Sequence, residues 1–389
     1  MGEYHRDMKI SFAVSEQSSV GIEWEVGLVD ADSHAFVPVA PDMLAHVEDS
    51  HGGPIRQEFF THMVELVSGV HRHVPSALAD LSDSLGRTRE LAAQQNAALI
   101  GAGTHPFSLS KDQQHYDYER YHQLADRIGY WAHQIAICGT HIHVGVDHQD
   151  KVLPITYGLA RFAPYFIALS ASSPFWEGQD TQYASHRTML FQQLPTNGLP
   201  YPLDSWPEFE QYADQLEKAG MIERAQDIRW DVRPAPAWGT IENRVMDSMS
   251  TLREVGALAA FSQCLTEFMS RELERGSAIS RLPVWFMKEN KWRAARYGLD
   301  TEVVTPLVHK RVRDLREGLL EWIERLEPVA HELGCYYELV FCRELVECGP
   351  SYVRQRRAAE RAGGDLRAVT SLLIDEMAGG EPIYEKERA

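Results

Sequence analysis

The sequence lacks the short motifs and cysteine patterns that identify several large classes of protein. Its five cysteines among 389 residues include no Cys-x-x-Cys pair, which argues against a zinc ribbon, and we expect each to be a buried or incidental thiol in a reducing compartment. No His-Glu-x-x-His, Walker A or Gly-x-Gly-x-x-Gly sequence occurs, which argues against a zinc protease, a P-loop enzyme and a Rossmann dinucleotide site.

A surplus of basic residues and long apolar runs are also missing. The 38 basic and 56 acidic residues give a net charge of −18, which disfavours nucleic acid or an anionic membrane as the main partner. Residues 1–11 are polar and mixed in charge, unlike a signal peptide, and no apolar stretch is long enough to span a bilayer. We therefore expect a cytoplasmic protein with a small-molecule substrate, and the acidic balance is compatible with a substrate delivered with a divalent cation.

One stretch near the N-terminus, residues 20–30, alternates between apolar and acidic side chains. Apolar residues occupy its even positions, while Glu23 and Glu25 occupy odd ones. This period of two is typical of a half-buried strand with one apolar and one acidic face. Carboxylates two residues apart lie roughly 6–7 Å apart, and at a dielectric near 20 they repel by about 2.5 kcal/mol. They need water, an arginine, a proton or a cation, and the pattern alone leaves a solvated strand face as an equal alternative.

The next predicted strand, residues 56–70, is rich in strand-forming residues and ends on glycine and valine. It carries Glu58 and Glu65, whose opposite parity lets both face one site only if a bulge or bend intervenes. Glu65 is the stronger candidate, because an acid inside an apolar strand needs a reason. An edge-strand charge that faces water explains Glu65 equally well from the pattern alone.

Two later strands repeat the design of an apolar face behind polar, metal-capable groups. The strand that begins at Cys138 places His141 and His143 on the same face. A strand further along the chain places Glu242 and Arg244 on one face. We expect His143 to support the site by hydrogen bonding rather than to bind a metal directly. Cys138 has no base paired to it in sequence, so a structural thiol is the better interpretation.

The remaining segments are mainly helical, with one loop-rich stretch. Residues 175–207, rich in proline, glycine, glutamine and aromatics, predict an active-site loop. Residues 227–234 alternate so that Arg229, Asp231 and Arg233 would lie together. Apolar periodicity predicts helices over residues 75–99, 152–172, 252–274, 303–333 and 352–378, the last pair broken at a Gly-Gly step. The polar and aromatic residues 111–136 are expected to form one or two further helices.

This order of elements predicts an α+β fold: a curved antiparallel β-sheet built from strands scattered along the chain and wrapped by α-helices. No internal repeat, low-complexity tract or obvious linker divides the sequence. We therefore expect residues 1–389 to form one domain, with a sheet-bearing part over about 15–250 and a mainly helical part over about 251–389.

The chemistry of the polar faces points to a hard divalent cation. Carboxylates with an imidazole suit Mg²⁺ or Mn²⁺, whereas thiolates would indicate zinc. A guanidinium offers a planar fork to carboxylate or phosphate, so arginines beside such acids imply an anionic, phosphorylated substrate. The metal candidates are Glu23, Glu25, Glu65, His141 and Glu242. The arginine candidates are Arg187, Arg229, Arg233, Arg244, Arg293 and Arg296, of which Arg233 and Arg244 lie inside strands that face the same way as the acids.

Five motifs in order then resemble the glutamate–cysteine ligase type 2 family of carboxylate–amine ligases. They span the chain from residue 20 to about residue 300, and five in order are specific where one alone would be weak. They read Gly-Ile-Glu-Trp-Glu, Cys-Gly-Thr-His-Ile-His-Val-Gly-Val, Arg-Trp-Asp-Val-Arg-Pro, Gly-Thr-Ile-Glu-Asn-Arg-Val-Met-Asp and Asn-Lys-Trp-Arg-Ala-Ala-Arg-Tyr-Gly-Leu-Asp.

The resemblance implies a glutamine-synthetase-like catalytic fold in which an antiparallel sheet curves into a cup. It implies a reaction in which ATP phosphorylates a carboxylate and an amine displaces phosphate from the acyl phosphate. Its substrates would be glutamate or another carboxylate, and cysteine or another amine, with ATP and Mg²⁺ or Mn²⁺. It also implies a homodimer or larger assembly.

Carried over to this sequence, the resemblance makes Glu23, Glu25, Glu65, His141 and Glu242 metal ligands. Arg244 and Arg233 are the catalytic candidates. The remaining arginines, Arg187, Arg229, Arg293 and Arg296, would bind ATP phosphates or the substrate carboxylate.

One position departs from the family pattern. Trp24 stands where the commonest opening motif has a third acid. Strand parity turns Trp24 toward the apolar face, so we expect the metal site to survive.

Two other functions fit the same residues. A divalent-metal hydrolase of amides or phosphate esters would need no ATP site, and a metal- or ligand-sensing module would bind without turnover. None of the expected metal positions is replaced, which argues mildly against the sensing module.

Overall fold

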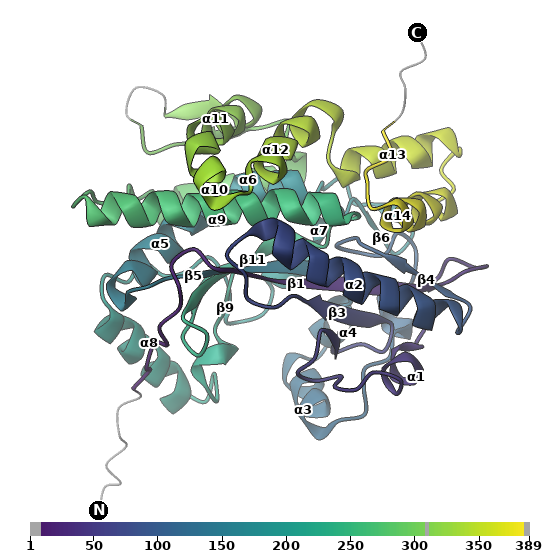
Figure 1. The fold of residues 1–389 in the computed structure, drawn as a ribbon. Helices are drawn as coiled ribbons and strands as arrows, with labels where there is room; N and C mark the ends of the chain where they lie inside the picture. Colours follow the sequence, from purple (N-terminus) through teal and green to yellow (C-terminus); the bar gives the residue numbers. More distant parts are fainter. Residues whose placement is uncertain (1–8, 308–310, 385–389) are drawn as a thin grey trace, which may run out of the picture.

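A seven-stranded antiparallel sheet lies at the centre of the computed structural model, which describes residues 9–307 and 311–384 (Figure 1). The strands run in the order β10-β11-β5-β1-β3-β2, with β4 paired to the second half of β1. The mixed α+β fold with a large antiparallel sheet is therefore as predicted. The strand bounds are β1 (Val20–Asp30), β2 (Ile55–Gln57), β3 (Met63–Val67), β4 (Ala97–Ile100), β5 (Gly139–Gly145), β10 (Val232–Ala235) and β11 (Thr240–Asp247).

The apolar face of β1 is buried in the core, as the alternation predicts. Its five even-numbered side chains from Val20 to Leu28 are at most 1% exposed. Trp24 belongs to this set, and its indole Nε1 donates to Ser248 Oγ and to the Met249 carbonyl oxygen, each at 3.2 Å. The tryptophan that stands in place of the third acid thus ties β1 to the segment that joins β11 to α9.

Helices cover this apolar face in two layers (Figure 1). α2, α5, α6 and α9 contact the strands, and α10, α11 and α12 pack outside them. The bounds are α2 (Val74–Ala93), α5 (Gln149–Arg161), α6 (Ala163–Ser170), α9 (Leu252–Glu274), α10 (Val284–Tyr297), α11 (Leu315–Leu333), α12 (Tyr336–Cys348), α13 (Ser351–Arg361) and α14 (Arg367–Gly379).

Shorter elements lie on the polar side of the sheet and leave a hollow between them. In Figure 1, α8 and β9 lie below one half of the sheet, and α1, α3 and α4 lie below the other. Their bounds are α1 (Ala40–Leu44), α3 (Glu119–Ile128), α4 (Trp131–Gln134), α8 (Trp206–Lys218) and β9 (Arg229–Trp230). The remaining short elements are α7 (His186–Phe191), β6 (Phe175–Trp176), β7 (Gln179–Asp180) and β8 (Asn197–Gly198), with 3-10 turns η1 (Ser110–Asp112) and η2 (Ala225–Asp227).

Two predicted elements in the first hundred residues have wrong bounds. Residues 56–70 form the hairpin β2–β3 rather than one strand, so a turn follows Gln57 and separates Glu58 from Glu65. The helix predicted to reach residue 99 ends at Ala93, because Asn96 adopts a left-handed conformation with φ of 52°. The chain then returns as β4 beside β1.

Three further expectations need correction. The apolar helix over 152–172 is broken at Phe162, where α5 and α6 meet at 54°. Residues 175–207 are not a simple loop, since they contain α7 and three short strands. The helix predicted from residue 303 starts only at Leu315, after a hairpin of β12 (Glu302–Val304) and β13 (Val312–Asp314), because Asp314 caps it by accepting the Glu317 N–H at 3.0 Å.

All strands of the large sheet precede residue 250, and α9 to α14 follow it, with the β12–β13 hairpin among the helices. The grouping of residues 1–389 into one domain stays a prediction, and residues 1–8, 308–310 and 385–389 of it lie outside the described residues.

Within the described ranges no single helix is long and apolar enough to cross a membrane, and the bent pair α5–α6 meets that test only when its two helices are taken together.

The buried indole of Trp24 gives a test of the core. We expect Trp24→Ala to lower the free energy of unfolding by about 3–5 kcal/mol, because it leaves a cavity behind the sheet. Trp24→Phe keeps an aromatic ring but loses the indole hydrogen bonds, so it should lower the free energy of unfolding by about 1–2 kcal/mol. Urea unfolding measures both. Trp285→Ala, at a side chain that is 68% exposed, is the control, and equal midpoints for Trp24→Ala and Trp285→Ala would contradict the placement.

Candidate active site

Strand register brings the predicted acids and histidines into direct contact across the polar face of the sheet. Glu23 on β1 is paired with His141 on β5, and Glu25 is paired with Glu65 on β3. Glu242 on β11 is paired with His143 on the other side of β5. Residues that are more than 200 positions apart in the sequence therefore share one patch of about four strands.

His141 lies at the centre of this patch. Its Nδ1 is 3.2 Å from Glu23 Oε2 and 4.0 Å from Glu242 Oε1, and its Nε2 is 3.9 Å from Glu25 Oε1. Burial and the nearby Arg244 lower the pKa of His141, so the imidazole is neutral near pH 7 and has a lone pair to offer. Two sets of three ligand atoms lie within 4.8 Å of one another: Glu23, His141 and Glu242, and Glu25, Glu65 and His141.

His143 is adjacent to this cluster but belongs to neither set of three. Its Nδ1 lies 2.8 Å from Thr240 Oγ1, and its Nε2 is 3.5 Å from Glu23 Oε1. Although burial opposes it, the charges of Glu242 and Glu23 raise the pKa of His143. When protonated, His143 would be a counter-ion for these two acids, and its supporting role stays a prediction.

Glu242 is held by two arginines. Arg233 Nε donates to its Oε2 at 2.7 Å, and Arg244 Nη1 donates to its Oε1. Burial would raise the pKa of Glu242, yet the two guanidiniums bring it well below its ordinary value, so Glu242 is a carboxylate. Arg233 also donates to the carbonyl oxygens of Gln226 and Ile228. These hydrogen bonds all go to protein groups, so Arg233 holds the carboxylate of Glu242 in position.

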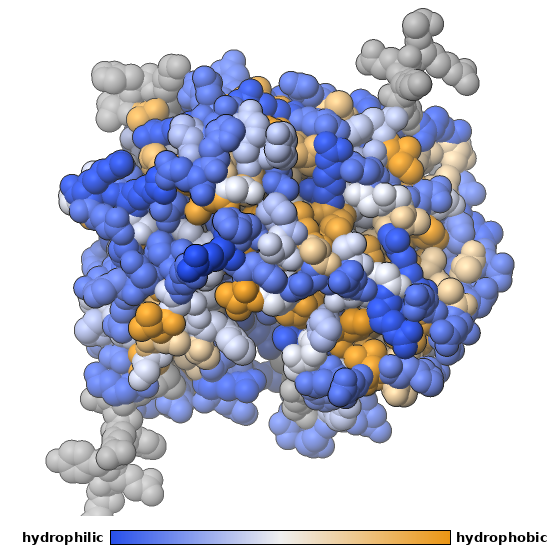
Figure 2. Space-filling view, viewed as in Figure 1, coloured by the Kyte–Doolittle hydropathy of each residue, from blue (hydrophilic) through white to orange (hydrophobic). Residues whose placement is uncertain are grey.

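The polar face opens into a cavity of about 360 Å³. Acids of β1 and β3, Glu58, three arginines and apolar side chains line it. A second hollow of about 370 Å³ continues from it and shares Tyr121, Leu194 and Arg229. Figure 2 shows a notch at the lower edge, between the parts that carry α8 and α3. The ionisable side chains that line it belong to Glu23, Glu25, Glu58, Glu65, His141, Arg187, Arg229 and Arg244.

Glu58 enters this cavity through the turn that separates β2 from β3. From the sequence, Glu58 could share a face with Glu65 only if the chain bends between them, and the turn provides that bend. Burial, together with the charge of Glu25, raises the pKa of Glu58 to about 8. Burial and the charges of Glu23 and Glu58 raise the pKa of Glu65 well above its ordinary value. Although burial opposes the change, hydrogen bonds from the two histidines lower the pKa of Glu23 well below its ordinary value.

The acids therefore divide into carboxylates on one side and protonated carboxyls on the other. Glu58 and Glu65 keep protons because burial disfavours their charged forms and neighbouring acids on the same face add to that effect. A cation that entered the cavity would take the place of those protons.

Arg187 is buried at 3% exposure on α7, within the stretch predicted as an active-site loop. Its guanidinium lies over the Phe191 ring at 5.4 Å, and its Nε has no hydrogen-bond partner among the described residues. It approaches Gly139 so closely that a Cβ there would overlap its Nη2, so glycine is needed at the start of β5. Arg187 is thus a buried cation that faces the cavity with donors to spare.

Cys138, next to this arginine, is buried. Burial raises the pKa of its thiol well above the ordinary value, so the group stays protonated, as expected for a structural cysteine.

Asp231 does not join Arg229 and Arg233 on one face, contrary to the alternation read from the sequence. The break between β9 and β10 turns Asp231 inward, where its carboxylate lies 2.7 Å from Lys291 Nζ of α10, both groups being buried. Arg229 faces the cavity instead.

The structure does not bring Arg293 and Arg296 to the cavity. Arg293 Nε donates to Glu289 on its own helix at 2.7 Å, and Arg296 donates to the Gln182 carbonyl oxygen. Lys291 takes the inward face of α10, which leaves these two arginines on its outer face. Their role in binding stays a prediction without support from this geometry.

Comparison with known proteins identifies the family. The sequence profile described as glutamate–cysteine ligase family 2 (GCS2) matches residues 19–371. The chain belongs to this family. The resemblance read from its five motifs is therefore confirmed, and with it the class of ATP-dependent carboxylate–amine ligases.

Members of the GCS2 family match along the whole chain. A protein of Arthrobacter sp. (strain FB24) named "Putative glutamate–cysteine ligase 2-1" is 45% identical, covering 96% of this chain and 99% of that protein. A protein of Leifsonia xyli subsp. xyli (strain CTCB07) named "Putative glutamate–cysteine ligase 2" is also 45% identical over the same shares.

Solved structures agree in fold. Glutamate–cysteine ligase of Francisella tularensis, solved in complex with AMP, superposes with a TM-score of 0.67 at 14% identity, covering 95% of this chain and 94% of that one. A bifunctional glutathione synthetase of Pasteurella multocida superposes with a TM-score of 0.64 at 18% identity, covering 94% of this chain and 52% of that one. At such identities the likeness shows a shared fold.

The protons on Glu58 and Glu65 predict the pH dependence of metal binding by this GCS2 member. Both pKa values are raised, that of Glu58 to about 8, so protons leave these carboxyls as the pH rises above neutral and the carboxylates gain charge. We expect Mn²⁺ or Mg²⁺ affinity to increase from about pH 6 to about pH 9, with proton release on binding. Calorimetry in two buffers of different ionisation enthalpy measures both.

Glu58→Gln should flatten that pH dependence, because one of the two titrating carboxyls is gone. Glu302→Gln, at an exposed acid on β12, is the matched control. An affinity that does not change with pH in the unaltered protein would contradict this assignment.

Proposed function

We propose that this chain joins a carboxylate of glutamate to the amine of cysteine at the expense of ATP. Three facts support the proposal: membership of the GCS2 family, a cavity lined by both acids and arginines, and ligand atoms close enough together to hold a divalent cation. The observation that carries most weight is the pairing of Glu23 with His141 and of Glu242 with His143 across three strands, which gathers the acids where a phosphoryl group would need a cation.

The reaction explains why the site contains both acidic and basic side chains. Oxygen of the substrate carboxylate attacks the γ-phosphorus of ATP, and the bond to ADP breaks. Nitrogen of the amine then attacks the acyl carbon, phosphate leaves with the bonding electron pair, and the nitrogen loses a proton. Each step brings anions together, so fixed positive charge is required before the bonds change.

Mg²⁺ or Mn²⁺ would be held by Glu23, Glu25, Glu65, His141 and Glu242. The fit rests on the two sets of ligand atoms within 4.8 Å and on their donor set, carboxylate oxygens with a single neutral imidazole. When bound, the cation would neutralise charge on ATP phosphate oxygens.

The chain's own cations would complete the neutralisation. Arg187 has unused donors, Arg229 lines the cavity, and Arg244 reaches it from beside Glu242. We assign them to phosphate oxygens and to the substrate carboxylate. Arg233 holds Glu242 in place. The apolar lining, including Phe59, would exclude water that otherwise hydrolyses an acyl phosphate. A homodimer or larger assembly stays a prediction.

The assay for this function supplies ATP, Mg²⁺, glutamate and a panel of amino acids, and follows ADP and phosphate. We expect release of both products to need glutamate and to rise most with cysteine. Release without any amine, or stimulation by none of the panel, would favour a hydrolase or a silent binding module instead.

Glu242→Gln tests the acid cluster within that assay. It removes a candidate ligand and the negative charge that Arg233 and Arg244 face, so we expect kcat/KM to fall by about 10²-fold or more. Glu302→Gln, an exposed acid-to-amide change, should leave the rate unchanged. Full activity in Glu242→Gln would overturn the proposed metal site.

Arg187→Gln tests the buried cation separately. Because its Nε makes no hydrogen bond within the described residues, the free energy of unfolding should change by about 1 kcal/mol or less, while kcat/KM falls by about 10²-fold. Arg87→Gln, in an exposed pair with Glu90, is the control. Thermal melts and steady-state kinetics measure the two effects. A large loss of stability with normal kinetics in the remaining folded protein would show that Arg187 is structural.

A further inference from the structure

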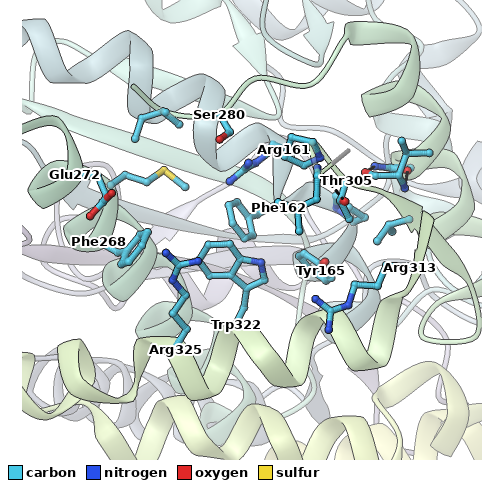
Figure 3. Close-up of a pocket in the computed structure, with 18 of the residues that line it drawn as sticks. Arg161, Phe162, Tyr165, Phe268, Glu272, Ser280, Thr305, Arg313, Trp322 and Arg325 are labelled. Carbon is cyan, nitrogen blue, oxygen red and sulfur yellow. Dashed lines mark hydrogen bonds between the residues drawn. The ribbon is translucent and has the colours of Figure 1, made fainter. Parts of the chain in front are cut away.

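A separate cavity, of about 230 Å³, lies within the helical layers, apart from the two hollows described above (Figure 3). Its walls come from the corner between α5 and α6, the end of α9, the β12 segment and α11. It shares no lining residue with the cavity on the polar face of the sheet. The ligase reaction proposed above uses none of its side chains.

Three arginines line this cavity, and two of them lack an anionic partner. Arg161 lies with its guanidinium 4.8 Å from the Phe162 ring centre and makes no hydrogen bond or ion pair within the described residues. Arg325 lies over the rings of Phe268 and Trp322, at 4.7 and 4.9 Å, and likewise has no such bond there. Arg313 differs, since Glu321 pairs with it.

The charge balance in this cavity is unusual for an acidic protein. The chain carries 56 acidic residues, yet Glu272 is the one carboxylate among the residues that line the cavity, and it is already paired with Arg275 at 3.1 Å. Burial lowers the pKa of Arg161 to about 10, which still leaves it positively charged near pH 7. A half-buried cation without a counter-ion costs free energy, and an oxyanion would recover it.

Aromatic rings form the apolar part of the cavity. Trp322 meets Phe162 and Phe268 edge-on, with centroid distances of 4.8 and 5.7 Å. Figure 3 shows Arg161 and Arg325 entering from opposite sides of this aromatic group. A ligand that touched both kinds of wall would have an anionic group and an apolar body.

The volume limits the size of that ligand. Pockets for drug-sized ligands measure roughly 300–1,000 Å³, and this cavity is smaller. We propose that it is a binding site for a small organic anion whose carboxylate or phosphate is recognised by Arg161 and Arg325 and whose apolar body packs on Phe162, Phe268 and Trp322. The site is separate from the ligase cavity and does not depend on the function proposed for it.

Calorimetric titration of the full chain with two probes tests this site. Phenyl phosphate and benzoate carry a phosphate and a carboxylate on the same ring, and benzyl alcohol is the neutral comparison. We expect at least one anion to bind about tenfold or more tightly than benzyl alcohol. The tighter anion identifies which oxyanion the site prefers. No binding of either anion up to about 10 mM would overturn the proposal.

Variants locate the bound probe. Arg161→Gln with Arg325→Gln should weaken anion binding about tenfold or more. Arg325→Gln alone, at an exposed position, should weaken it measurably and guards against a fold defect in the double variant. Arg311→Gln is the matched control, because Arg311 lies over Phe286 at 5.4 Å but does not line the cavity.

The ligase cavity also contains arginines, so Arg187→Gln serves as a second control. Binding that survives this change and is lost in the double variant supports the proposal. Binding that is lost in Arg187→Gln and kept in the double variant places the anion in the ligase cavity and overturns the proposal.

Discussion

Crowding of like charge on one face of the sheet is the constraint on which the site depends. Glu23, Glu25, Glu58 and Glu65 line one buried cavity, and a single pair of carboxylates at 6–7 Å already repels by about 2.5 kcal/mol at a dielectric near 20. The fold relieves this in two ways. Histidines and arginines compensate Glu23 and Glu242, while Glu58 and Glu65 retain protons. In the function proposed above, a bound cation would relieve the remaining repulsion.

The helical layers make this arrangement possible because they pack on the apolar face of the sheet and leave its polar face for the site. The apolar face of β1 is buried against helices, and Trp24 anchors it there. Elsewhere the layers are tied by polar groups as well: Arg354 of α13 donates to Glu254 of α9 at 2.8 Å and to Glu376 of α14 at 2.5 Å, with all three side chains buried. A buried charge held by two partners fixes the packing of three helices without exposing apolar surface.

The sequence was most informative where its period matched a regular element. Alternation over residues 20–30 predicted β1, its buried face and the side on which Glu23 and Glu25 lie, and the same holds for His141 and Glu242. It failed where irregular backbone decides the direction of a side chain. The turn after Gln57 brings Glu58 into the cavity, and the break after β9 turns Asp231 away from it. Nor could spacing alone show which face of α10 points into the molecule, and so Arg293 and Arg296 were expected beside acids that they do not reach.

The buried pair of Lys291 and Asp231 has a mechanical consequence. Asp231 lies in the chain between Arg229, which lines the ligase cavity, and Arg233, which holds Glu242. Lys291 follows Asn290, which lines the cavity among the helices. This buried ion pair joins α10 to the chain between β9 and β10. A movement of α10 would therefore be transmitted to the segment that carries Arg229 and Arg233 while the pair is intact.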